Sequence, residues 1–258
     1  MDHAEVFLTG LQGALERIAP DDDVGVLFSG GLDSCIVAAL LARERQVTLY
    51  TAGLEGSYDL RSGERAAEIM NLPWVPIVPD EEELLDGVRS IIRSTGTVNP
   101  ILISFDIPLY FVSSRAKERM LFSGQGADEL FAGIARCKDL DEVKRQECMD
   151  TDMAKLLNET LAGEASIAKD FGKDLRYLFL DPGVVDAVKA MSLGPEAGPD
   201  INKIILREVA RRLELGELAE RREKTDRYGP GSMRSLREVA KGRGITMRAL
   251  MQQLAEEV

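Results

Sequence analysis

The sequence predicts an α/β fold, with a parallel sheet of about five strands, helices on both faces of the sheet and a helical C-terminal half. In the first half of the chain, short apolar runs alternate with helical patterns, which is typical of parallel strands joined by crossover helices. Small residues follow two of the apolar runs, as expected where strands end in tight turns. Beyond residue 136 the pattern becomes helical and rich in charge. We therefore expect an α/β core at 1–136 and a helical part at 137–258 that completes the same domain.

The individual elements follow from apolar periodicity and from turn residues. Strands are expected where short apolar runs are bounded by turn residues, at 24–28, 47–52, 74–78 and 120–122. Helices are expected where apolar residues recur at helical spacing, at 4–18, 35–44, 64–69, 81–93, 107–117 and 201–213.

Composition excludes several classes of function. The chain has 258 residues, of which 45% are hydrophobic, and no apolar run approaches the roughly 20 residues that span a bilayer. Its net charge of −12 argues against a general binder of nucleic-acid backbones. The single histidine, His3, argues against a Ser-His-Asp triad and a multi-histidine metal site. We therefore expect neither a membrane nor a nucleic acid as partner.

Cysteine usage points to a reducing compartment. Cys35, Cys137 and Cys148 have neither CxxC spacing nor an even number, and the first residues lack the positive start of a signal peptide. We therefore expect three thiols and a cytoplasmic protein. The oligomeric state, a homo-oligomer included, stays open.

The segment 29–34, SGGLDS, follows the first predicted strand and leads into a helix. Its two glycines allow a close backbone approach, and the helix N-terminus attracts an anion, so a phosphate group is the natural ligand. No lysine lies in this loop, which excludes the ordinary P-loop, whereas Asp33 suggests a metal ion that bridges to phosphate oxygens. The alternative is purely structural, with Gly-Gly forming a turn and Asp33 or Ser34 capping the helix.

The segment 123–129, SGQGADE, follows the fourth predicted strand. Its small residues would let a nucleotide lie against the main chain, and Asp128 and Glu129 supply oxygen ligands for a Mg²⁺ shared with the first loop. The alternative is that the two carboxylates only favour the start of a helix.

These motifs resemble those of the ATP pyrophosphatase superfamily. SGGLDS is similar to its pyrophosphate-binding loop, and residues 121–133 resemble the SGxGxDELFGG signature of the asparagine synthetase and β-lactam synthetase branch. Further similar stretches occur in family order at 56–59, 107–110, 179–182, 205–208 and 223–232. The resemblance implies an adenine nucleotide alpha hydrolase-like fold, with ATP at the C-terminal ends of the strands.

The resemblance also implies a role for individual residues. In the family, the aspartates that correspond to Asp33 and Asp128 hold Mg²⁺ on the pyrophosphate portion of ATP. Lys224 corresponds to a lysine that stabilises the transferring phosphorus and the departing pyrophosphate, although its charge pattern alone favours a solvated helix surface. The implied nucleotide contacts are Ser29, Gly30, Gly31, Leu32, Asp33, Ser34, Ser123 and Gly124.

The chain differs from asparagine synthetases at Gln125, where the family commonly carries an acidic residue suspected of handling ammonium or protons. A carboxamide cannot act as a general base, so proton handling and the choice of acceptor are both open to change. Alternatively, Gln125 hydrogen-bonds a neighbouring loop or the substrate carboxylate.

By resemblance, the expected activity is that of an ATP-dependent amide-forming ligase. A carboxylate, with aspartate as the leading candidate, would be adenylated with release of pyrophosphate, and ammonia would then give the amide and AMP. Because no glutaminase region precedes the similar stretches, we expect ammonia from solution or from a separate glutaminase subunit. The alternatives are an amide ligase or tailoring enzyme that acts on another carboxylate, and a non-catalytic nucleotide-binding regulatory protein.

Overall fold

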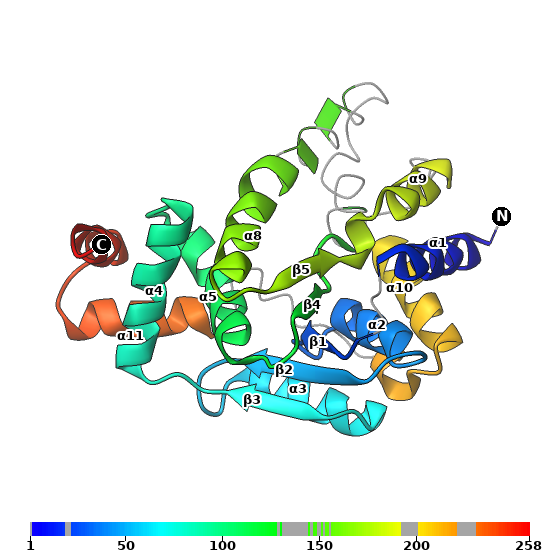
Figure 1. Ribbon diagram of the computed structural model, residues 1–258, viewed down its shortest axis with the longest axis horizontal. Coiled ribbons are helices and arrows are strands. Elements are labelled where there is room, and N and C mark those ends of the chain that lie inside the picture. Colours follow the sequence, from blue (N-terminus) through cyan, green and yellow to red (C-terminus); the bar gives the residue numbers. More distant parts are fainter. Residues whose placement is uncertain are drawn as a thin grey trace.

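A five-stranded parallel sheet forms the centre of the computed structural model (Figure 1). Its strands are β1 (Val24–Leu27), β2 (Val47–Ala52), β3 (Trp74–Ile77), β4 (Met120–Ser123) and β5 (Asp174–Tyr177). They lie in the order β3-β2-β1-β4-β5, and each neighbouring pair is parallel. The predicted α/β class and the size of the sheet are confirmed.

The structure describes residues 2–18, 22–127, 130, 144, 147–148, 151, 153–154, 156–191, 201–220 and 231–258. The predicted boundary at residue 136 lies outside these residues.

Helices cover both faces of the sheet, as predicted. One face carries α1 (His3–Ile18), α2 (Leu32–Leu41), α3 (Tyr58–Met70), α9 (Pro182–Ala190) and α10 (Ile201–Arg212). The other carries α4 (Glu81–Thr95), α5 (Pro100–Arg115), α8 (Leu161–Asp170), α11 (Ser232–Gly242) and α12 (Met247–Glu256). Among the described residues, the shorter helical segments are η1 (Leu156–Thr160), η2 (Leu178–Leu180) and η4 (Gly216–Glu220).

The apolar core is divided by the sheet into two clusters. Strand side chains alternate between the two faces, so neighbours along β4 belong to different clusters: Phe122 packs with α1 and α2, whereas Leu121 packs with α4 and α5. Both side chains are fully buried. A parallel sheet buried on both faces is what keeps its strand ends in a fixed arrangement.

Strand β5 comes from a part of the chain where the sequence analysis expected only helices. It pairs with β4 along its whole length, from Met120 opposite Asp174 to Ser123 opposite Tyr177. Its four residues include two charged ones and none is fully buried, because β5 is an edge strand. So short and polar a strand has no apolar run that sequence analysis could detect.

Helix α5 also differs from its prediction, because it begins at Pro100 and not near residue 107. The Asn99 side chain accepts a hydrogen bond from the backbone N–H of Ile101 at 3.0 Å, and proline suits the first helical position. The helix packs against neighbours on several sides and is apolar around most of its circumference, so it lacks the one-sided pattern from which a helix is predicted.

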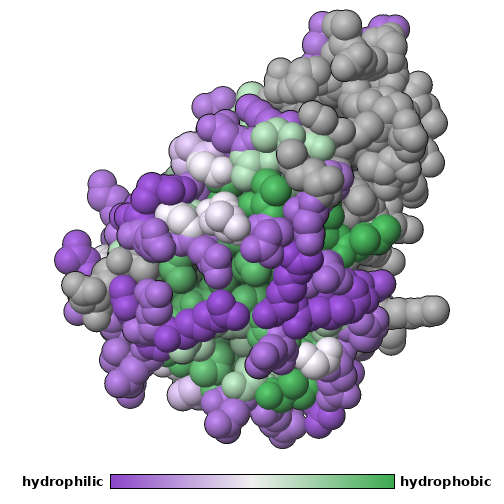
Figure 2. All heavy atoms as spheres, turned by 90° about the vertical axis from the view of Figure 1, so that its right-hand side faces the viewer, coloured by the Kyte–Doolittle hydropathy of each residue, from purple (hydrophilic) through white to green (hydrophobic). Residues whose placement is uncertain are grey.

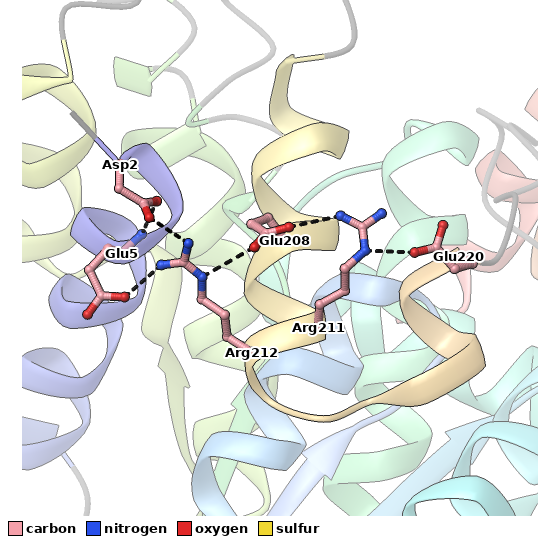
Figure 3. Close-up of polar contacts among 6 residues, drawn as sticks. All are labelled: Asp2, Glu5, Glu208, Arg211, Arg212 and Glu220. Carbon is pink, nitrogen blue, oxygen red and sulfur yellow. Dashed lines mark hydrogen bonds and ion pairs between the residues drawn. The ribbon is translucent and has the colours of Figure 1, made fainter.

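Charged side chains join the N-terminal segment to α10 and η4 (Figure 3). Arg212 contacts Asp2 at 2.7 Å and Glu5 at 2.6 Å, while Arg211 bridges Glu208 and Glu220. The hydrogen bond from Arg212 lowers the pKa of the Asp2 carboxyl below its ordinary value. Individual exposed ion pairs contribute little, but this network links segments more than 200 positions apart in the chain.

The outer surface on this side of the molecule is largely polar. Figure 2 shows the side that carries α1, α9 and α10, where hydrophilic side chains predominate and apolar atoms are visible between them. Among the described residues, no helix combines the length and the apolar character needed to cross a membrane.

The cysteines do not all match their prediction. Cys35 is a free, buried thiol in α2, as expected. Cys148 is disulfide-bonded, so the expectation of three thiols is wrong. Cys137 lies outside the described residues.

Candidate functional site

The two predicted loops meet where β1 and β4 end. The strands are direct neighbours, with Leu27 opposite Ser123, and each is followed by its glycine-containing loop. The strand order changes direction between them, since β2 follows β1 on one side and β4 lies on the other. In open α/β sheets, ligands bind in the crevice at such a switch point.

The first loop packs so closely against α3 that only glycine fits at position 30. Gly30 has φ = +69°, and a Cβ there would lie 2.3 Å from the carbonyl oxygen of Ser62 in α3. The loop is also closed internally, because the N–H of Gly31 donates to Ser29 Oγ at 3.2 Å and Ser34 Oγ donates to the Gly31 carbonyl at 3.0 Å. The loop is thus set directly at the N-terminus of α2.

The second loop packs against the first turn of α2. A Cβ on Gly124 would lie 2.8 Å from the backbone nitrogen of Ser34, so the two main chains approach each other closely. Gly126 has φ = +100° and is equally tight against Leu180. Between them, the N–H of Gln125 donates to Ser123 Oγ at 3.2 Å. Gly124 therefore lets the second loop approach α2, and Gly126 lets the same loop pack against Leu180.

The structure brings together most of the predicted site residues. Ser29, Gly30, Gly31, Leu32, Asp33, Ser34, Ser123, Gly124 and Gln125 all lie in the two adjoining loops or in the first turn of α2. Asp128 and Lys224 lie outside the described residues. The side chains of Leu32 and Ser34 are buried, so their contacts with a ligand would come from the backbone.

After Lys224, the described chain resumes at Gly231, next to the segment that follows β2. A Cβ on Gly231 would lie 3.5 Å from Asp59 Oδ2 in the first turn of α3, and 3.9 Å from the Leu54 nitrogen in the loop that follows β2. The similar stretches at 56–59 and 223–232, far apart in sequence, therefore adjoin at their described ends.

A cavity of about 930 Å³ opens beside the two loops. It is lined by Asp33 from α2, by residues 124–126, by the C-terminal end of α4, by α5 and by the segment from η1 to α8. This volume suits a ligand of nucleotide or drug size. Asp33 and Gln125 are half-buried and border the same space.

Two carboxylates that the sequence analysis did not single out also line this cavity. Asp106 lies in α5 and Glu164 in α8, and they are only 8% and 7% exposed. The Tyr177 hydroxyl donates a hydrogen bond to Glu164 Oε2. Asp106 was detectable in principle, because it is the first charged residue in the otherwise apolar α5.

Burial changes the protonation of this part of the lining. Desolvation, reinforced by the Glu164 charge, raises the pKa of the Asp106 carboxyl to about 7. Desolvation and the same glutamate raise the pKa of the Tyr177 hydroxyl far above its ordinary value. This part of the lining is therefore poised to hold or release a proton near neutral pH.

A second group of titratable side chains has a structural role. Tyr50 donates to Glu118 Oε2 at 2.8 Å, and Lys173 Nζ donates to the Ala116 and Glu118 carbonyls at 2.6 and 2.9 Å. Burial raises the pKa of Tyr50 to about 12, with its hydrogen bond to Glu118 adding to the shift. These groups lie just before β4 begins, at the opposite end of this strand from the glycine loops, and they satisfy one another.

The donor set near the loops fits a magnesium ion held together with phosphate oxygens. Asp33 is half-buried beside the glycine loops, where no Cβ obstructs the main chain, and carboxylate oxygen is the ligand that Mg²⁺ prefers. Within the described part of the chain, no group of three or more His, Cys, Asp or Glu side chains could hold a metal by itself. Asp33 could supply one carboxylate oxygen to a metal ion at this position.

The model of the family described as "Asparagine synthase" matches residues 8–170, more than half of the chain. The chain belongs to the asparagine synthase family. A Methanocaldococcus jannaschii protein named as a glutamine-hydrolyzing asparagine synthetase is 29% identical over 92% of this chain and 51% of its own length. A glutamine-hydrolyzing asparagine synthetase of Triphysaria versicolor is 31% identical over 76% of this chain and 37% of its own length.

The chain thus spans about half or less of the length of these relatives. Among solved structures, an NMN synthetase of Francisella tularensis is 12% identical with a TM-score of 0.46, over 98% of this chain and 84% of that one.

The close approach at Gly30 predicts an unusually costly substitution. Gly30→Ala should destabilise the protein by more than about 2 kcal/mol, because a left-handed backbone conformation and a clash with the Ser62 carbonyl act together. Gly56→Ala is the matched control, since Gly56 has φ = +66° with nothing within 4 Å of its Cβ position, and should cost about 1 kcal/mol. Urea denaturation measures both, and equal costs would contradict the proposed clash.

The raised pKa of Asp106 predicts a pH-dependent stability. The folded protein keeps a proton on Asp106 that the unfolded chain releases above about pH 4, so the free energy of unfolding falls as pH rises from about 4 to 7. Asp106→Asn removes this loss, and at about pH 8 it should be more stable than the wild type by up to about 4 kcal/mol. The gain should shrink towards about pH 5 in urea denaturation. A gain that does not depend on pH would contradict the ionisation of Asp106 as its cause.

Proposed function

We propose that this chain is an ATP-dependent amide-forming ligase that activates a carboxylate as an acyl-adenylate. The observation that carries the proposal is the contact between the two glycine loops, in which Gly124 lies against the first turn of α2. Membership of the asparagine synthase family supports the same activity.

The loops would bind the pyrophosphate portion of ATP. Backbone N–H groups at the N-terminus of α2 are oriented to donate to phosphate oxygens, and the positive end of the helix dipole favours their negative charge. The glycines allow the nucleotide to reach this backbone without obstruction by side chains.

Carboxylates on both loops would complete the phosphate site. Asp33 borders the cavity, and Asp128 follows the second loop in sequence. We propose that these two aspartates hold the magnesium ion, which when bound neutralises charge on the β- and γ-phosphates. Gly124 and Gly126 would keep the second loop close enough to α2 for both carboxylates to act together.

The reaction then proceeds in two displacements. A substrate carboxylate oxygen attacks the α-phosphorus of ATP, and the bond to the pyrophosphate oxygen breaks. A nitrogen nucleophile next attacks the acyl carbon, and AMP leaves with the electron pair of the C–O bond. Lys224 is proposed to stabilise the charge that develops during the first displacement, as a compact cation suited to a transition state.

The names of the relatives indicate the class of acceptor and the source of nitrogen. The relatives are named as asparagine synthetases that hydrolyse glutamine, which favours aspartate and ammonia as substrates. Ammonia would come from solution or from a glutaminase subunit. A different carboxylate is the second candidate, and Gln125 at the cavity wall favours it because the family's acidic residue is absent there.

Isotope exchange between pyrophosphate and ATP tests the adenylation step. Asp33→Asn should abolish exchange supported by aspartate or by another accepted carboxylate, because the metal loses a charged oxygen ligand. Lys224→Ala should lower the exchange rate by about 10² or more while ATP binding changes little. Asp86→Asn, an exposed substitution on α4 of the same chemical kind, is the control and should behave as wild type. No exchange by the wild type with any carboxylate would overturn the proposal.

Gln125→Glu separates adenylation from nitrogen capture. If an acidic residue at this position assists the nucleophile, amide formation from ammonium should increase while pyrophosphate exchange stays constant. Unchanged rates of both reactions, with aspartate as acceptor, would assign Gln125 to a hydrogen-bonding role alone.

A further inference from the structure

The lining of the cavity includes two buried carboxylates that the proposed adenylation does not use. We call this pair, Asp106 and Glu164, the acidic wall. The two residues come from different helices, α5 and α8, yet each acts electrostatically on the other. Both border the same cavity as Asp33 and Gln125.

Asp106 lacks a partner within the described part of the chain. It is more than nine-tenths buried, and no described group donates a hydrogen bond to it or forms an ion pair with it. The nearby Tyr177 hydroxyl is directed to Glu164 and does not satisfy Asp106. The Asp106 oxygens are not among the fully buried polar atoms that lack a partner, and the residue lines the cavity, so a hydrogen-bond donor that enters the cavity can reach this carboxylate.

The charge of the cavity indicates which group that is. Four acidic residues line it, whereas none of its described lining residues is Lys, Arg or His. The four are Asp33, Asp106, Glu159 and Glu164. A carboxylate or phosphate at the acidic wall would be repelled, but a protonated nitrogen brings both positive charge and hydrogen-bond donors.

We infer that the acidic wall binds a protonated nitrogen of the substrates, either an ammonium ion or a primary ammonium group. This inference deepens the proposed ligase activity and rests on it. Two apolar side chains of the same helix, Leu102 and Phe105, line the cavity together with Asp106.

If the bound nitrogen is the nucleophile, the wall also takes its protons. Ammonium gives one proton to Asp106, and the freed lone pair forms the C–N bond to the acyl carbon. The C–O bond to AMP breaks with its electron pair, and the nitrogen loses a second proton to Glu164. Both protons return to water when the products leave. If the nitrogen instead belongs to the acceptor, no proton moves and the wall only orients that substrate.

Binding is tested with methylammonium chloride as the probe, compared with potassium chloride at equal ionic strength. Methylammonium should raise the melting temperature of the wild type above its value in potassium chloride. This difference should disappear in Asp106→Asn, weaken in Glu164→Gln and persist in the exposed control Asp86→Asn. Equal effects of the two salts on the wild type, or a difference that persists in Asp106→Asn, would overturn the inference.

Rates identify the source of the nitrogen. If it is the nucleophile, Asp106→Asn should lower amide formation from ammonium by about 10² or more while pyrophosphate exchange remains within about twofold. If it belongs to the acceptor, exchange and amide formation should fall together and the KM for the acceptor should rise. Unchanged rates of both would refute a role in the reaction. A wild type without exchange would remove the ligase proposal, whereas the methylammonium measurement would still report on the wall.

Discussion

The candidate site depends on a close approach of backbone to backbone between the loops that follow β1 and β4. Gly30 lies against Ser62 of α3, and Gly124 lies against Ser34 of α2, at separations that leave no room for a side chain. Parallel pairing fixes the two strand ends side by side, and the glycines let the loops complete the contact. A helix N-terminus, two loops and a cavity are thereby combined at one edge of the sheet.

The sheet keeps this arrangement because it is buried on both faces. Two separate apolar clusters hold the strands from opposite sides, and the helices that supply the cavity walls, α4, α5 and α8, belong to one of them. Ion pairs at the surface join the N-terminal segment to α10 on the other face (Figure 3). The site is thus built at the edge of a packed core, which limits how far its parts can move apart.

Two carboxylates, Glu118 and Asp106, differ in whether the fold supplies them with hydrogen-bond donors. Before β4, burial alone would raise the pKa of Glu118, but hydrogen bonds from Thr48 and Tyr50 and the charge of Lys173 lower it. Near the cavity, Asp106 has no such donors, and burial beside Glu164 raises its pKa. A satisfied buried group stabilises the fold, whereas an unsatisfied one in a cavity is a binding feature that costs stability until its partner arrives.

The sequence alone determined the fold class, the strands β1 to β4 and the two loops of the site, because these depend on local features. Apolar runs, glycine pairs and helix periodicity act over a few residues, and the motifs at 29–34 and 123–129 are continuous in the chain. Such local features did not predict the short polar strand β5, because its pairing with β4 stabilises it. They also did not predict the start of α5 at Pro100, because that helix is stabilised by burial on several sides. Only the tertiary structure placed Asp106 of α5 opposite Glu164 of α8 and removed both from water. The role proposed for them depends on that shared burial, which arises when distant helices pack together around one cavity.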